Sequence, residues 1–421
     1  MRKVLVNSRM TIAIWIIVGL SLIGVIARPM NWPEWIWAVA GAAALVAFGF
    51  MPLAATGAAI SKGTDVYLFL TGMMLLSEAA RAEGAFDWVA VHSVKRARQS
   101  PKRLFLLIFL TGVVVTTFLS NDATAVVLTP AVLATARKAK ADPLPLLFSC
   151  ALIANAASFV LPISNPANLV LFGDHMPPLG WWLASFTLPS LASVIVTFFV
   201  LRFLLRARLS GLCEGDVAVP SLGRGGKIAL TMIALTAVTL IAVSAFDIQL
   251  GLPTIVTGLI AISAICISVQ RSPLPLLKGI SWGILPLVAG LFVLVEAVNR
   301  TGAIDRLAGL LQYAAQETAW GTVLAGSTLA VTTNLMNNLP AGLMTATAIA
   351  QAQPPRVLVD SLLIAVDLGP NLSVTGSLAT LLWLQAIRRE GQEVSFWTFL
   401  KIGAVAMPLA LAAALAVRLL I

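Results

Sequence analysis

The sequence predicts an all-α polytopic membrane protein with ten transmembrane helices, two re-entrant hairpins and an inverted-topology repeat. Three observations predict this fold class. Of the 421 residues, 59% are hydrophobic and only 11% are charged. Apolar runs long enough to cross a bilayer recur along the whole chain, and the second half of the sequence repeats the first. A soluble core of this length could not use so much apolar surface.

Ten apolar segments are predicted to be full spans. They are 11–27, 35–53, 65–82, 143–161, 183–205, 227–246, 252–269, 280–298, 357–371 and 396–420. Two further segments, 103–138 and 319–352, are too long for one crossing, because a helix of about 35 residues would run about 50 Å through a hydrocarbon core of about 30 Å. Each is therefore predicted to fold back on itself.

The first of these two segments has basic residues at both ends. They are Lys95, Arg96, Arg98, Lys102 and Arg103 before it, and Arg137, Lys138 and Lys140 after it. Lys and Arg favour the cytoplasmic side, so both ends are expected there. The polar letters "SNDA" at 120–123 then form the tip of a hairpin at mid-membrane, where non-helical backbone is tolerated only inside protein or beside a water-filled cavity.

The internal repeat is read from two pairs of segments. "GMMLLSEAARAEGAFDWVA" at 72–90 matches "GLFVLVEAVNRTGAIDRLA" at 290–308, and "TFLSNDATAVVLT" at 117–129 matches "TNLMNNLPAGLMT" at 333–345. The offset is 218 residues and then 216, and Asn155 aligns with Asn371. A steady offset of this kind indicates a duplicated structural unit.

The repeat divides the chain into an N-terminal unit (1–205), a polar cytoplasmic linker (206–226) and a C-terminal unit (227–421). Each unit holds three spans, one hairpin and two spans. Five crossings are an odd number, so the second unit is inverted, and hairpin 319–352 opens to the periplasm while hairpin 103–138 opens to the cytoplasm. With both termini periplasmic in the inner membrane, twenty of the 28 Lys and Arg residues lie inside, although the basic N-terminus opposes this orientation.

Transporters with inverted repeats bind substrate near the midplane, where helices are broken. Four breaks are predicted: the two hairpin tips, "NAASFVLPISNPAN" (155–168) and "DLGPNLSVTGSLAT" (367–380). The candidate substrate-binding residues in them are Ser120, Asn121, Asn155, Ser158, Ser164, Asn165, Asn168, Asn337, Asn338, Asn371, Ser373, Thr375, Gly376 and Ser377. For any single amide or hydroxyl, the alternative is that it satisfies backbone groups freed by Pro or Gly.

Two carboxylates, Asp122 and Asp367, are the candidate proton-coupling residues. A carboxylate inside a membrane is costly unless it is paired or protonated, so function is the first interpretation, with a helix cap as the alternative. Glu78 and Glu296 occupy equivalent places in the two units. Basic residues follow three and four positions later, at Arg81 and Arg300, so structural ion pairs are expected.

The composition excludes several functional classes. The chain has a net charge of +10 but no nucleic-acid-binding motif, and Cys150, Cys213 and Cys266 are scattered, so no cofactor, metal site or disulfide is predicted. No HExxH, GxSxG or GxxxxGK[ST] motif is present, so we expect a transporter rather than an enzyme. The four breaks contain no Lys or Arg, which anions usually recruit; this favours a small neutral, hydroxylated solute or a cation.

The motifs in the breaks resemble a known family. "LGPNLSVTGSLATLLWL" (368–384), "LMNNLP" (335–340), and "LSNDATAVVLTP" (119–130) followed by "SNPANLV" (164–170) resemble the arsenite/antimonite efflux permeases of the ArsB type, within the ion-transporter superfamily. The resemblance covers most of the chain. It departs from the pattern at Asn155 and Asn371, where Asp and Lys are frequent in the family, and both changes remove charge.

The resemblance implies efflux of trivalent arsenic and antimony as neutral hydroxides across the inner membrane, in exchange for protons, with a soluble ATPase as a partner of some members. The implied site comprises Asn121, Asp122, Asn337, Asn338, Asp367 and the hydroxyls of the broken spans. Three alternatives stay open: a sodium-coupled carboxylate or inorganic anion transporter, a channel, and the membrane subunit of an ATP-driven arsenite pump.

Overall fold

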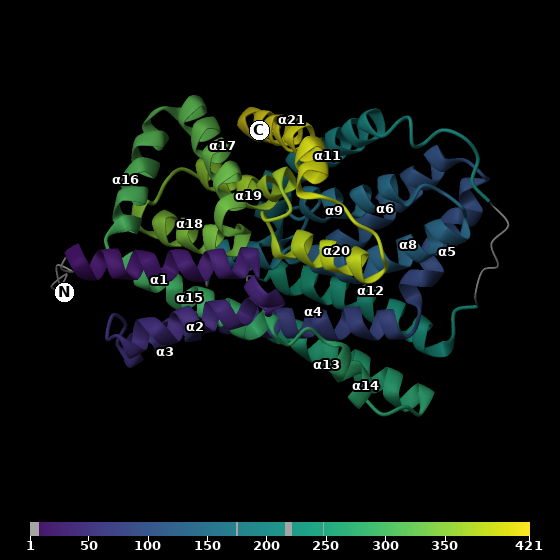
Figure 1. The fold of residues 1–421 in the computed structure, drawn as a ribbon, viewed down its shortest axis with the longest axis horizontal. Coiled ribbons are helices and arrows are strands. Elements are labelled where there is room, and N and C mark those ends of the chain that lie inside the picture. Colours follow the sequence, from purple (N-terminus) through teal and green to yellow (C-terminus); the bar gives the residue numbers. More distant parts are fainter. Residues whose placement is uncertain (1–7, 174–175, 215–220, 247) are drawn as a thin grey trace.

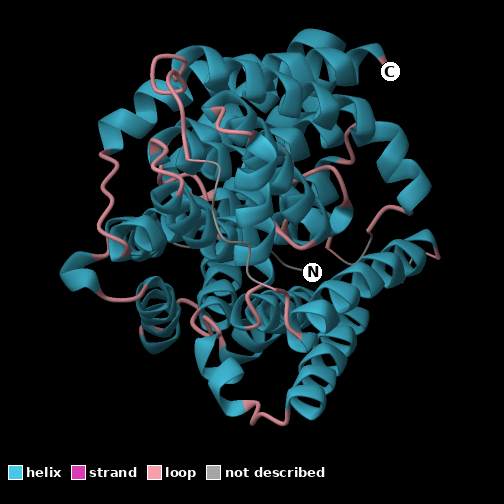
Figure 2. Ribbon diagram, turned by 90° about the vertical axis from the view of Figure 1, so that its right-hand side faces the viewer, coloured by secondary structure: helices cyan, strands magenta, loops and turns pink. Residues whose placement is uncertain are grey.

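The computed structural model describes residues 8–173, 176–214, 221–246 and 248–421 (Figure 1). These residues form helices joined by short loops, with no strand among them (Figure 2). The predicted all-α class is therefore confirmed. Part of the predicted linker, 215–220, lies outside the described residues.

The predicted N-terminal unit, residues 1–205, contains eleven α-helices within the described residues. They are α1 (Ser8–Ala27), α2 (Glu34–Ala47), α3 (Leu53–Ser61), α4 (Thr64–Ala82), α5 (Ala85–Ala97), α6 (Pro101–Phe118), α7 (Asn121–Ala123), α8 (Thr129–Lys138), α9 (Pro143–Ala156), α10 (Pro166–Phe172) and α11 (Leu179–Leu204). A 3₁₀ helix lies at η1 (Pro29–Asn31), a π-helix at η2 (Thr124–Leu128) and a second 3₁₀ helix at η3 (Pro162–Ser164).

The C-terminal unit has the same kinds of element. Its helices are α12 (Arg224–Ala245), α13 (Gly251–Val269), α14 (Leu274–Gly279), α15 (Ile284–Arg300), α16 (Ala303–Gln316), α17 (Thr318–Met336), α18 (Asn338–Ala352), α19 (Arg356–Leu368), the 3₁₀ helix η4 (Gly369–Leu372), α20 (Leu378–Arg389) and α21 (Phe396–Leu420). Helix breaks therefore lie within both segments predicted to be hairpins, between α6 and α8 and between α17 and α18. That these segments are re-entrant in a membrane stays a prediction.

Six helices among the described residues are long and apolar enough to cross a membrane unaided: α1, α6, α11, α12, α13 and α21. A seventh candidate is the pair α15 and α16, whose axes meet at 79°. The other predicted spans correspond to shorter, broken or more polar helices, such as α2, α9 and α19. The membrane-spanning character is confirmed, whereas the number of ten spans stays a prediction.

Five helices, α1, α2, α4, α13 and α15, form a scaffold against which the broken helices pack. In Figure 1, α1, α2, α4, α13 and α15 lie in a lower layer, and α2 packs on α1 and α15 while α4 packs on α13. The α4–α13 contact depends on small residues: a Cβ added to Gly72 would overlap the backbone of Thr254, and one added to Gly258 would overlap Gly72. Small residues allow such close helix contacts where lipid supplies no hydrophobic driving force.

The broken helices of the two units pack crosswise. Helix α10 of the N-terminal unit contacts α18 of the second hairpin, and α20 of the C-terminal unit contacts α7, η2 and α8 of the first. In Figure 1, α6 and α8 lie to the right of the centre and α17 and α18 to its left. The breaks of both units consequently meet at the middle of the molecule.

Candidate functional site

The first hairpin breaks between α6 and α7. Helix α6 ends at Phe118, and Ser120 caps the next helix by accepting a hydrogen bond from the Ala123 backbone N–H at 3.1 Å. The Asn121 Oδ1 atom accepts from the Asp122 N–H at 2.9 Å. The chain then continues through the π-helix η2, a feature that is frequent at functional sites. Side-chain capping explains why Ser and Asn stand here, because the first N–H groups of a helix have no partner within it.

The second hairpin breaks at one residue. Asn337 has a φ of 77° and caps α18, with its Oδ1 accepting from the Leu339 N–H at 3.3 Å. The Asn338 N–H donates to the Gly376 carbonyl at 2.9 Å, which ties this tip to the break in 367–380. A Cβ at Gly376 would overlap Pro370 and the Asn334 side chain, so glycine is required by the close approach.

In each of the two broken spans, the helix after the break begins with a side-chain cap. Asn165 caps α10 through the Ala167 N–H at 3.0 Å, and Ser377 caps α20 through the Thr380 N–H at 3.1 Å. Asn165 also donates from Nδ2 to Oδ1 of the buried Asp367 at 2.7 Å. The second oxygen of Asp367 has no hydrogen-bond partner among the described residues. Asp367 thus joins the break of one unit to the break of the other.

The first residues of all four restarted helices line a single small cavity of about 10 Å³, which we call the central cavity. Its lining is Asn121 and Asp122 from α7, Asn165 and Pro166 at α10, Asn338 and Leu339 from α18, and Leu378 and Ala379 from α20, with Leu70 and Ile284 from the scaffold. The space is that of about one water molecule. Helix N-termini carry partial positive charge, so the wall can stabilise negative charge or ligand oxygens.

Several polar groups of this wall are not used within the protein. Neither the Asp122 carboxylate nor the Asn338 amide makes a side-chain hydrogen bond or ion pair with any described residue. The Asn121 side chain uses its oxygen for the cap, and no described residue accepts from its Nδ2. Asn121 and Asn338 are nevertheless almost completely buried, each 2% exposed. Buried polar groups are normally paired, so these side chains are suited to a ligand.

Asn155 and Asn371, which the repeat aligns, are in direct contact. The Asn155 Nδ2 atom donates to Asn371 Oδ1 at 3.0 Å, and Asn371 Nδ2 donates to the Leu152 carbonyl at 2.9 Å. Asn155 Oδ1 has no partner among the described residues. Both side chains are buried, and neither lines the central cavity.

Other predicted site residues use their polar groups to hold the breaks together. Asn168 donates to the carbonyls of Ser158 at 2.9 Å and Pro162 at 3.2 Å. Ser158 donates to the Asn155 carbonyl at 2.7 Å, and Ser164 donates to the Thr117 carbonyl at 3.0 Å. None of these three lines the central cavity. The alternative interpretation, repair of the interrupted backbone, describes their contacts.

Ser373 and Thr375 are held by a residue that sequence reasoning missed. Asn334 Oδ1 accepts from the Ser373 N–H at 3.1 Å and its hydroxyl at 2.8 Å, and Asn334 Nδ2 donates to the Gly369 carbonyl at 3.0 Å. Thr375 donates to the Asn334 carbonyl at 2.8 Å. Asn334 thereby fastens α17 to the break beside it. The sequence feature that could have identified Asn334 is its place in "TTNLMNNLP", one helical turn before the tip.

A buried ion pair was also missed. The Arg418 Nη2 and Asp360 Oδ2 atoms are 2.7 Å apart, with Asp360 fully buried and Arg418 6% exposed. It fastens α21 to α19. The expected ion pairs Glu78–Arg81 and Glu296–Arg300 are confirmed, with N–O distances of 2.5 and 3.5 Å.

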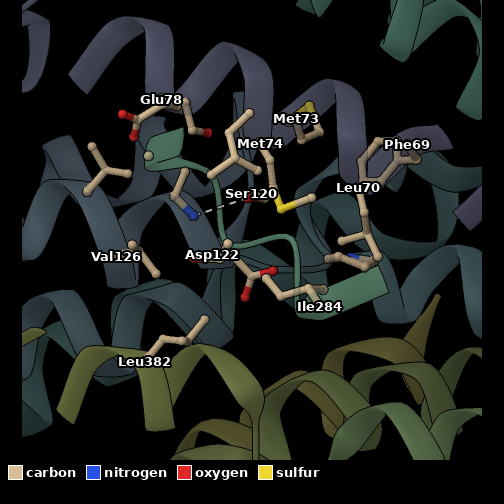
Figure 3. Close-up of a pocket in the computed structure, with 17 residues that line it drawn as sticks. Phe69, Leu70, Met73, Met74, Glu78, Ser120, Asp122, Val126, Ile284 and Leu382 are labelled. Atoms are coloured by element: carbon tan, nitrogen blue, oxygen red, sulfur yellow. Dashed lines mark hydrogen bonds between the residues drawn. The ribbon is translucent and has the colours of Figure 1, made fainter. Parts of the chain in front are cut away.

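Two larger cavities continue from the central one. The inner cavity, of about 60 Å³, shares Leu70, Asp122, Pro166 and Ile284 with it and also contains Ser120 and Glu78. The Asp122 side chain projects into this space, between Ile284 and Val126 (Figure 3). The vestibule, of about 540 Å³, adjoins the inner cavity at Glu78 and holds Arg81, Asp87, Arg389 and Glu390. A chain of cavities therefore runs from Asp122 to the vestibule, which α8 lines and which contains Glu390, the ion-pair partner of Arg137.

No group of three or more His, Cys, Asp or Glu side chains within the described ranges is placed to hold a metal ion.

Comparison with known proteins gives one family and several relatives. The sequence profile of a family described as citrate transporters (CitMHS) matches residues 12–370. An uncharacterized transporter of Mycobacterium tuberculosis is 28% identical over 360 residues, which cover 81% of this chain and 82% of that protein. The arsenical pump membrane protein of Escherichia coli K12 is 27% identical over 362 residues, covering 79% and 81%.

Among solved structures, the Alcanivorax borkumensis YdaH transporter is similar, with a TM-score of 0.56, 15% sequence identity and coverage of 87% of this chain and 86% of that one. At this identity the likeness concerns the fold alone.

Proposed function

Because the chain belongs to the citrate transporter (CitMHS) family and is a membrane transporter of the type that includes the arsenical pump membrane proteins, we propose that it exports trivalent arsenic and antimony. The substrate is the neutral hydroxide, arsenous acid or its antimony analogue, and protons move in the opposite direction. The observation that carries the proposal is the central cavity, whose polar side chains are three amides and one carboxylate, with no Lys or Arg.

The chemistry of this wall suits a small molecule with hydroxyl groups. The central cavity has room for one hydroxyl rather than for the whole molecule. A hydroxyl both donates and accepts, so one hydroxyl of arsenous acid can accept from the amide nitrogens of Asn121 and Asn338 there. The rest of the molecule then lies in the adjoining inner cavity, where Asp122 can accept from a second hydroxyl. Three scattered cysteines cannot provide three-fold thiolate binding, and a carrier must also release what it binds. Hydrogen bonds to amides meet both requirements.

Coupling is assigned to the two carboxylates of the breaks, Asp122 and Asp367. Asp122 faces the route and is free to exchange its proton for contact with substrate, while Asp367 is bonded to Asn165 across the interface of the two units. Proton binding from the periplasm and release to the cytoplasm would alternate with loading and unloading of the hydroxide. In the orientation predicted from the basic residues, the vestibule and inner cavity open to the cytoplasm, so this arrangement is the loading state.

The main rival is a sodium-coupled carboxylate or inorganic anion transporter, which the convergence of helix N-termini favours. Against it, the same cavity already contains the Asp122 carboxylate, and a second negative charge there would be repelled. The N-termini can instead offset the charge of Asp122 itself. A citrate-sized anion would need cationic partners that the cavity wall lacks. Any ATPase that energises transport would be a separate subunit.

Everted membrane vesicles test the proposal. With an acidic lumen imposed, arsenite should accumulate inside without nucleotide, and the accumulated arsenite should leak out when a protonophore collapses the gradient. Accumulation that requires an imposed sodium gradient would support the anion-transporter rival, and accumulation only with ATP and a soluble subunit would support the pump. Either result would contradict proton exchange.

A further inference from the structure

One ion pair stands where the inner cavity meets the vestibule. Glu78 lines both spaces, together with Val126, Val127, Gly279, Ser281 and Leu382. Among these shared residues it is the one with a charged side chain. Arg81 lines the vestibule but not the inner cavity. The carboxylate therefore lies on the Asp122 side of the junction and the guanidinium on the outer side.

The position of the Glu78 carboxylate is fixed. Arg81 holds it with two bonds, from Nε to Oε2 at 2.7 Å and from Nη2 to Oε1 at 2.5 Å. On the other side, a Cβ added to Gly279 would overlap the carboxylate, so the backbone of α14 packs against it. The Glu78 side chain is 8% exposed and that of Arg81 is 51% exposed. The buried partner presents negative charge to the inner cavity, while water screens the exposed partner.

The equivalent pair in the C-terminal unit has different surroundings. Glu296 is 3.5 Å from Arg300 and 3.3 Å from Lys62, and it lines neither the inner cavity nor the vestibule. The repeat thus contains equivalent ion pairs in both units. Of the two pairs, only Glu78–Arg81 lines the described route to Asp122. A purely structural role would not distinguish the two copies.

We propose that the Glu78–Arg81 pair forms a charged neck on the substrate route, which admits neutral and cationic solutes and disfavours anions. The proposal deepens the proposed function, because it takes the chain of cavities as the route of the transported solute. Such a neck would allow this chain to discriminate neutral arsenous acid from anions such as citrate, after which its family is named. The neck acts on the charge of whatever enters, so it can be measured without transport.

Thiol-reactive probes of opposite charge provide the measurement. In a protein with Cys150, Cys213 and Cys266 replaced by Ala, Met74→Cys places a thiol in the inner cavity and Ala134→Cys places one in the vestibule. The probes are a cationic and an anionic methanethiosulfonate of similar size. At position 74, Glu78→Gln should lower the ratio of cationic to anionic reaction rates about fivefold or more, as expected for removing one unit charge a few ångströms away.

Three controls make the result specific. Glu296→Gln should leave the ratio at position 74 unchanged, and Glu78→Gln should leave the ratio at position 134 within about twofold, because water screens charge there. The double variant Glu78→Gln/Arg81→Gln removes both charges and should show the same lowered ratio as Glu78→Gln. It controls for instability that an unpaired Arg81 could cause in the single variant. Gly279→Ala displaces the carboxylate without changing charge and should also lower the ratio.

The proposal is overturned by an unchanged ratio at position 74 in Glu78→Gln, by an equal change in Glu296→Gln, or by no reaction of either probe at position 74. An unchanged ratio with fast labelling would place the route through the neighbouring cavity, which meets the inner one at Ser281, Ile284 and Leu382 and contains Arg28. Failure of arsenite transport in vesicles leaves the labelling result intact, so the two hypotheses fail separately.

Discussion

The two hairpin tips have matching sequences but different surroundings. The repeat aligns Asn121 with Asn337 and Asp122 with Asn338. At the first tip, a carboxylate faces the inner cavity, which continues into the vestibule. At the second tip, Asn334 and its partners Ser373 and Thr375 fill the adjoining region with hydrogen bonds.

This difference is what alternating access requires of a duplicated fold. In any one state, a carrier gives its site one open side and one closed side, although its units are built from equivalent elements. Under the proposed function, the first tip would supply charge and access, and the second tip would supply amides and the closed side.

The largest expected effect concerns the charge of the first tip. Asp122→Asn should reduce gradient-driven arsenite accumulation about 10- to 100-fold, the factor for loss of a hydrogen bond to a charged group. The double variant Asp122→Asn/Asn338→Asp moves the carboxylate to the second tip, and because both residues line one cavity, part of the activity should return. Vesicle transport across a range of pH measures both. An Asp122→Asn protein with unchanged pH dependence would show that Asp122 is not the coupling group.

The next effect concerns stability rather than transport, and it is expected where the aligned residues Asn155 and Asn371 touch. Asn155→Asp buries a charge with no cationic partner and should destabilise the protein by about 3–5 kcal/mol. Asn155→Asp/Asn371→Lys supplies the partner and should recover much of that loss. Unfolding in SDS measures both variants and Asn371→Lys alone. If the double variant is as unstable as the sum of the single ones, the two side chains do not interact in the folded protein.

Local features of the fold were predictable because local physics sets them. The apolar runs and the i,i+3 pair Glu78–Arg81 depend on neighbouring residues, and the structure contains them. Ser120 and Asn337, predicted to bind substrate, are helix caps. The sequence offers a cap instead as the alternative for Asp122 and Asp367. The repeat aligns Asn155 with Asn371, and these two residues are in contact.

The remaining features depend on tertiary packing. Asn334 aligns with Phe118 in the repeat, so the repeat gave no signal for a polar residue whose partners lie 35 to 41 positions away. Asp360 and Arg418 are 58 residues apart on two helices whose contact no periodicity reveals. The bend of 79° between α15 and α16 likewise lies at Gly302, whose φ is 80°. In this segment, hydropathy predicted only the end of a span.

The proposed site exists only if the two tips meet inside the membrane. Spin labels at Asn121→Cys and Asn338→Cys, in the cysteine-free protein reconstituted in liposomes, test this by electron paramagnetic resonance. We expect strong dipolar broadening between the labels and low collision rates with lipid-dissolved oxygen at both, as for buried residues around one cavity. Labels that show no mutual broadening, or that collide freely with oxygen in the acyl-chain region, would contradict the proposed site.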